Sequence, residues 1–100
     1  MKKANRHYQP WSLEEAREFV IHYLEGIKYR DVKTVISQYA EKVERTFDAV
    51  AFRQKEILSI LTNAEKGLGR DKWTKEFQQV IQELIEEGKY SKNKLIMLFE

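Results

Sequence analysis

The chain has 100 residues, of which 42% are hydrophobic and 34% are charged, and its net charge is +2. These values suit one compact domain, or one domain with a small appendage, built on a thin core. Cysteine is absent, which excludes a disulfide framework, a thiol nucleophile and the cysteine-based zinc motifs. No apolar run has the length of a membrane span or of a signal peptide, so we expect a cytoplasmic protein outside the membrane.

The first ten residues form a basic segment. They contain Lys2, Lys3 and Arg6 and no acidic residue, which leaves the other ninety residues with a net charge of −1 out of the total of +2. A basic arm ahead of a folded body can lie in a minor groove or along phosphates. We therefore interpret residues 1–10 as a flexible DNA-binding arm, and a solubilising terminus without a partner is the alternative.

A first helix is predicted from Leu13 to about Glu25. Ser12 and Glu15 have the spacing of a capping box, and Gly26 can supply the left-handed residue that often ends a helix. Trp11 is expected to pack back over the core. The expected buried stripe consists of Leu13, Ala16, Val20, Tyr23, Leu24 and Ile27, with Phe19 on its flank.

Two further helices are predicted, from Val32 to about Glu44 with Asp31 as the cap, and from Thr46 to about Thr62 with Thr46 itself as the cap. No Gly or Pro separates them, so one continuous helix over residues 31–63 with a heptad-like seam is the alternative. In the third helix the expected buried stripe consists of Phe47, Val50, Ala51, Ile57, Leu58 and Leu61.

The other side of the third helix is our candidate for reading DNA. Small Ala49 leaves space for a close approach, and Arg53 can reach a phosphate or a guanine edge. An ordinary amphipathic helix with a solvated charged face is the alternative. The predicted DNA contacts are Lys2, Lys3, Arg6, Arg45, Thr46, Ala49, Phe52, Arg53 and Lys55.

Residues 63–72 are rich in turn formers and predict a linker to a carboxyl-terminal appendage over residues 73–100. The appendage is predicted to hold a strongly one-sided helix that stops at Gly88 and a last helix capped by Ser91. The terminal run 95–99 is apolar on every side, which favours self-association or a partner, and a tail tucked against the body is the alternative. The predicted oligomer or partner surface consists of Phe77, Ile81, Leu84, Leu95, Ile96, Leu98 and Phe99.

Catalytic and metal chemistry finds little support in the sequence. His22 stands alone on the first helix, and the glutamates have the pattern of solvated faces. Gly67-Leu68-Gly69 resembles a phosphate-cradling turn but lacks the Walker spacing and a preceding strand. We expect no enzyme activity, no metal, no cofactor and no small-molecule substrate.

Three motifs resemble a Myb/SANT-like helix-turn-helix domain over residues 11–61. They are Trp11-Ser12-Leu13-Glu14-Glu15, Tyr29-Arg30-Asp31-Val32 and Arg45-Thr46-x-x-Ala49-Val50-x-x-Arg53. The resemblance implies a trihelical domain whose third helix reads DNA. The chain departs from the family in a longer spacing between Val32 and Arg45, in Gln54 at a place where an aliphatic residue is common, and in its last two helices.

The sequence therefore predicts an all-α fold, with a trihelical helix-turn-helix-like domain over residues 11–62 and two carboxyl-terminal helices. The predicted function is a small non-catalytic protein that binds double-stranded DNA as a homodimer. It would act as a transcriptional regulator or as an accessory factor of a phage or plasmid. A helical protein-interaction module, an adaptor or inhibitor that binds no DNA, is the alternative.

Overall fold

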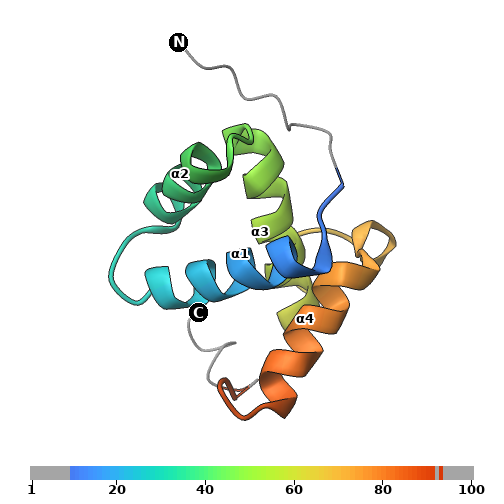
Figure 1. Ribbon diagram of the computed structural model, residues 1–100. Coiled ribbons are helices and arrows are strands. Elements are labelled where there is room, and N and C mark those ends of the chain that lie inside the picture. Colours follow the sequence, from blue (N-terminus) through green and yellow to red (C-terminus); the bar gives the residue numbers. More distant parts are fainter. Residues whose placement is uncertain (1–9, 92, 94–100) are drawn as a thin grey trace.

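The computed structural model describes residues 10–91 and residue 93. These residues form four α-helices and one short 3-10 turn and contain no strand, which confirms the predicted all-α class (Figure 1). None of these helices combines the length and the apolar character that crossing a membrane requires. Lys2, Lys3, Arg6, Leu95, Ile96, Leu98 and Phe99 lie outside the described residues. The elements are α1 (Leu13–Gly26), α2 (Val32–Val43), α3 (Phe47–Leu61), η1 (Arg70–Lys72) and α4 (Lys75–Glu86).

Three of the helices begin at the caps that the sequence predicts. The side-chain oxygens of Ser12, Asp31 and Thr46 each accept a hydrogen bond from the backbone N–H three residues on, at 2.7 to 3.1 Å. All three residues have an extended backbone, as an N-cap requires. These starts are local in origin, because each cap and its partner lie within one turn.

A three-residue turn, Glu44 to Thr46, separates α2 from α3. Glu44 has a left-handed backbone, with φ 59° and ψ 36°, which ends α2 although the position is not a glycine. The backbone N–H of Arg45 then donates to the Ala40 carbonyl at 3.0 Å, and α3 leaves the corner in a new direction (Figure 1). The two predicted helices are confirmed, and one continuous helix over residues 31–63 is excluded.

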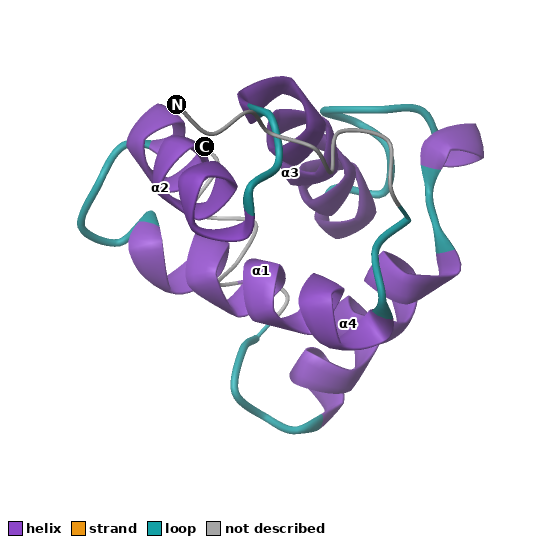
Figure 2. Ribbon diagram, turned by 45° about the horizontal axis from the view of Figure 1, so that its top comes forward, coloured by secondary structure: helices purple, strands orange, loops and turns teal. Residues whose placement is uncertain are grey.

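All four helices share one hydrophobic core. Helix α1 packs against both α2 and α4, and α3 packs against α2 and α4 (Figure 2). The rings of Trp11, Phe19, Tyr39 and Phe77 meet at the centre, with centroids 4.8 to 6.5 Å apart in the contacting pairs. Trp11 does pack over the core, and Phe19 is fully buried rather than flanking, because α1 lies between two helices and buries two sides.

The apolar face of α4 belongs to this core. Phe77, Ile81 and Leu84 are at most 4% exposed, which corrects their prediction as an oligomer or partner surface. The apolar stripe of α4 is one-sided, as predicted, but it faces α1 and α3 of the same chain. Helix α4 is therefore not an appendage on a separate trihelical body.

Residues 63–72 pack onto α3 instead of forming an open linker. Gly67 has φ +77°, and a Cβ atom at this position would lie 2.3 Å from the Lys55 carbonyl oxygen, so only glycine allows this approach. The hydroxyl of Ser59 donates a hydrogen bond to the carbonyl of Leu68. The segment thereby covers the carboxyl-terminal half of α3 and leads directly into α4.

Tyr23 in the last turn of α1 gives the free energy of unfolding a pH dependence at basic pH. Its hydroxyl accepts a hydrogen bond from Nε2 of Gln54 at 2.9 Å, and burial raises the pKa of Tyr23 from 10.0 to about 12. A raised pKa in the folded state means that this contribution to stability is complete below pH 10 and is lost as the pH rises through 12. We expect the free energy of unfolding to fall across this range by on the order of 2 kcal/mol through Tyr23.

Urea unfolding between about pH 9 and about pH 12 measures this effect. Tyr23→Phe should reduce the decrease in the free energy of unfolding without removing it, because burial also raises the pKa of Tyr39. Tyr29→Phe is the matched control, since Tyr29 is 83% exposed, and it should leave the profile unchanged. Equal profiles for the two variants would contradict the role given to Tyr23.

Candidate nucleic-acid interface

Helix α3 presents one stripe of side chains to solvent. Each residue of an α-helix is turned by about 100° from the last, so Phe47, Ala51 and Lys55 follow one another along one side, with Asp48 and Phe52 next to them. Ala51 is half-buried and packs against the core, and the other four are exposed, Phe47 by 39% and Phe52 by 40%. We call these five residues the α3 outer stripe.

The predicted DNA contacts within α3 do not share one face. Phe52 and Lys55 lie on the α3 outer stripe, whereas Ala49 is half-buried beside it. Thr46 is half-buried, and its hydroxyl oxygen accepts the backbone N–H of Ala49 at 3.1 Å. Arg53 lies two residues from Lys55 and therefore points to a different side of the helix.

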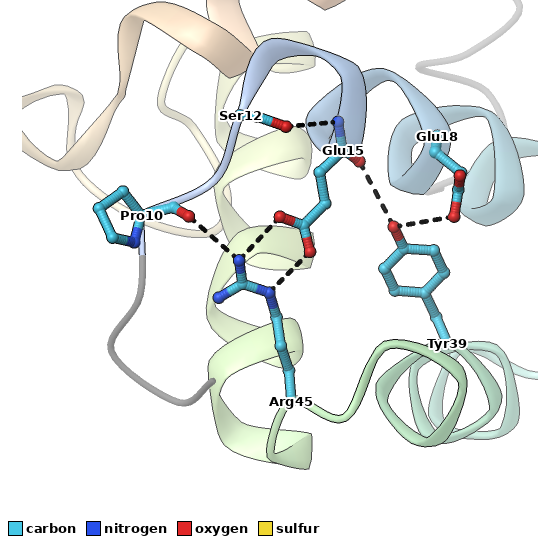
Figure 3. A network of polar contacts seen from close by, with 6 residues as sticks. All are labelled: Pro10, Ser12, Glu15, Glu18, Tyr39 and Arg45. Carbon is cyan, nitrogen blue, oxygen red and sulfur yellow. Dashed lines mark hydrogen bonds and ion pairs between the residues drawn. The ribbon is translucent and has the colours of Figure 1, made fainter. Parts of the chain in front are cut away.

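Arg45 is removed from the surface, which corrects its prediction as a DNA contact. Its side chain is 0% exposed, and two of its nitrogens donate to the carboxylate of Glu15 at 2.8 and 2.9 Å (Figure 3). Nη2 also donates to the Pro10 carbonyl at 3.2 Å, and the guanidinium lies 4.3 Å from the Trp11 ring centroid. Arg45 thus ties the turn before α3 to the start of α1.

The same end of α1 is also joined to α2. The hydroxyl of Tyr39 lies 3.4 Å from the Glu15 carbonyl oxygen and 3.4 Å from Oε1 of Glu18, and it donates toward both (Figure 3). Burial, followed by the nearby carboxylates, raises the pKa of Tyr39 above its ordinary value. Arg45 and Tyr39 therefore fix the α2–α3 corner against α1 from two sides.

Arg53 is half-buried and turned toward α4. Its Nη1 donates to Oε1 of Glu56 at 2.7 Å, and its guanidinium lies 5.3 Å from the ring centroid of Phe52 and 5.8 Å from that of Phe77. The Glu56 side chain is fully buried, so this ion pair is largely withdrawn from water. Arg53 is consequently engaged within the protein and is not part of the α3 outer stripe.

Two polar residues of α3 lie outside its predicted buried stripe and are nevertheless buried. Glu56 accepts hydrogen bonds from the backbone N–H of Thr74 at 2.6 Å and from its hydroxyl at 2.9 Å. Ser59 accepts from the indole N–H of Trp73 at 2.8 Å. Glu56 and Ser59 are three residues apart and therefore lie on one side of α3. This shared side is the only sequence signal for their burial.

Sequence reasoning also placed Phe47 and Ala51 on the buried face of α3. Phe47 is exposed, because the core is filled by Val50, Ile57 and Leu61, which lie on another side of the helix. Ala51 is half-buried and packs against this core, in line with its prediction. For Phe47 the available signal is its spacing of eight residues, or two turns of helix, from Lys55, a residue expected outside.

The α3 outer stripe carries one cation, Lys55, and one acid, Asp48, so it has no net charge of its own.

Within residues 10–91 and 93, no three His, Asp or Glu side chains gather closely enough to hold a metal ion. Comparison of the chain with protein-family models, with curated proteins and with solved structures finds no match.

Proposed function

We propose that the protein is a small, non-catalytic DNA-binding protein and that α3 is its recognition helix. The observation that carries this proposal is the turn from Glu44 to Thr46, which is anchored through Arg45 to α1 and leaves the α3 outer stripe exposed. The opposite side of α3 is fixed in the core, so the helix is a rigid element of a width that a major groove admits. Its resemblance to a Myb/SANT-like helix-turn-helix supports the same proposal.

In this proposal Lys55 contacts a phosphate or a guanine edge. Because the stripe itself has no net charge, Lys2, Lys3 and Arg6 supply much of the attraction to phosphates. The protein would serve as a transcriptional regulator or as an accessory factor of a phage or plasmid. A homodimer would use a surface other than the enclosed apolar face of α4.

Lys55→Glu is expected to weaken binding to duplex DNA about tenfold and to reduce the salt dependence of binding. The physical reason is that a cation facing the polyanion becomes an acid. Fluorescence anisotropy of the full chain with a labelled duplex, at about 50 mM and about 200 mM salt, measures both effects.

Lys75→Glu is the matched control for this experiment. Lys75 is exposed at the start of α4, and its substitution changes the net charge by the same amount away from the stripe. It should leave the affinity within about twofold. Equal losses for the two variants, or no binding by the parent chain at low salt, would refute the proposal.

A second function is favoured by one observation, the exposure of two phenylalanines of α3. Phe47 and Phe52 each expose an apolar ring that could contact a protein partner. A chain that binds no duplex at low salt, but whose binding to a protein partner is lost in Phe52→Ala, would establish this helical interaction module instead.

A further inference from the structure

A groove lies where the last turn of α3 meets α4. Its walls are the half-buried side chains of Ile60, Trp73 and Ile85, and the buried Ile81 forms its floor. The groove has a volume of about 340 Å³, roughly twice that of a cavity that accommodates one benzene ring. It therefore has room for about two large apolar side chains from outside the helices that form it.

The chain leaves α4 on the side opposite this groove. Glu83 of α4 faces Arg17 of α1, with 3.8 Å between the carboxylate oxygen and the guanidinium nitrogen. Ile85 lies two residues from Glu83, and successive residues of a helix turn by about 100°, so Ile85 points to the opposite side. Beyond α4 the hydroxyl of Tyr90 donates a hydrogen bond to the carboxylate of Glu25 on α1. The residues after Tyr90 therefore start from the α1 side and not from the groove of their own copy.

The sequence after Tyr90 contains a segment that suits such a groove. Residues 95–99 are five consecutive large apolar residues, and Lys92 and Lys94 precede them. Glu86 is exposed and lines one end of the groove, so opposite charges meet when the run enters it. Because the groove accepts about two of the five side chains, docking within one copy leaves about three of them in water. A run held between two copies is covered from both sides.

We propose that the groove between α3 and α4 binds residues 95–99 of a second copy of the chain. The contact is reciprocal, so two copies form a closed dimer in which each run occupies the groove of the other copy. The dimer surface is this open groove and not the enclosed face of Phe77 and Leu84. The inference does not depend on DNA binding, and it stands or falls separately from it.

Sedimentation equilibrium of the full chain measures the dissociation constant of the dimer. Ile96→Ser with Leu98→Ser is expected to raise this constant more than about 100-fold, because two large apolar side chains of each copy lose their cover. Gln82→Arg is expected to raise it at least about tenfold, because Gln82 is an exposed groove residue and arginine there repels the two lysines of the incoming run. Circular dichroism verifies that each variant is folded.

Gln79→Arg is the matched control for Gln82→Arg. Gln79 is also exposed on α4 but lies outside the groove lining, so the same substitution should change the dissociation constant by at most about twofold. Equal losses in Gln82→Arg and Gln79→Arg, or a parent chain that stays monomeric at about 1 mM, would overturn the proposal.

Disulfide trapping identifies which copy fills the groove, because the chain contains no cysteine of its own. A mixture of Gln82→Cys chains and Leu98→Cys chains should give a disulfide that joins the two variants, whereas Gln79→Cys in place of Gln82→Cys should give much less. A single chain that carries both Gln82→Cys and Leu98→Cys should likewise form linked dimers. A disulfide within one chain instead would show that residues 95–99 fill the groove of their own copy, and it would overturn the proposal.

Discussion

Arg45→Ala is expected to lower the free energy of unfolding by about 3–5 kcal/mol. The Arg45 side chain is 0% exposed and that of Glu15 is 12% exposed, so the substitution leaves a carboxylate enclosed without its partner. It also removes the hydrogen bond to Pro10 and the stacking on Trp11, both of which join the turn before α3 to α1. Urea unfolding followed by circular dichroism measures the loss.

Two variants show whether burial of the ion pair causes this loss. Lys42→Ala removes the partner of Glu18 in a pair whose side chains are 63% and 53% exposed, and it should cost at most about 0.5 kcal/mol. The double substitution Arg45→Met with Glu15→Met should recover much of the stability, because it leaves no buried charge. A loss below about 1 kcal/mol in Arg45→Ala would contradict the anchoring role.

The local features of the fold could be predicted from the sequence. Ser12, Asp31 and Thr46 act as caps through contacts within one turn, so their residue types and spacing suffice. The α2–α3 break was also predicted, although its left-handed residue is Glu44 and no glycine marks it. The one-sided pattern of α4 identified its buried face but could not identify the surface that covers that face.

The buried charges could not be predicted, because their partners are distant in the sequence. Arg45 is neutralised by Glu15 from thirty residues away, and Glu56 binds the backbone of Thr74 from eighteen residues away. A pattern of residue types treats every charged side chain as solvated unless a partner is known. The predicted interface therefore included Arg45, and it omitted Phe47, which the completed core leaves outside. It also included Arg53, whose partner Glu56 lies only three residues away but is itself fully buried.

Glu56→Ala is expected to lower the free energy of unfolding by about 3 kcal/mol and to loosen the start of α4. The fully buried carboxylate of Glu56 joins α3 to the start of α4. It accepts hydrogen bonds from the backbone N–H and the hydroxyl of Thr74, at 2.6 and 2.9 Å, and from Nη1 of Arg53 at 2.7 Å. Thr74 makes no side-chain cap of its own to α4, so the contact with Glu56 is what holds this helix start. Urea unfolding gives the total loss, and hydrogen exchange of the first α4 amides locates it.

Substitutions at Glu56 and Arg53 distinguish the charge from the hydrogen bonds. The Glu56→Gln side chain can still accept hydrogen bonds from Thr74, but it cannot neutralise the charge of Arg53. Glu41→Ala is the control, because Glu41 is exposed on α2. The free energy of unfolding lost in Glu56→Gln should lie between the losses in Glu56→Ala and in Glu41→Ala. Adding Arg53→Ala to Glu56→Ala should recover part of the stability, because it removes the guanidinium left without its carboxylate. Equal losses in Glu56→Gln and Glu41→Ala would show that the charge of Glu56 does not hold α3 against α4.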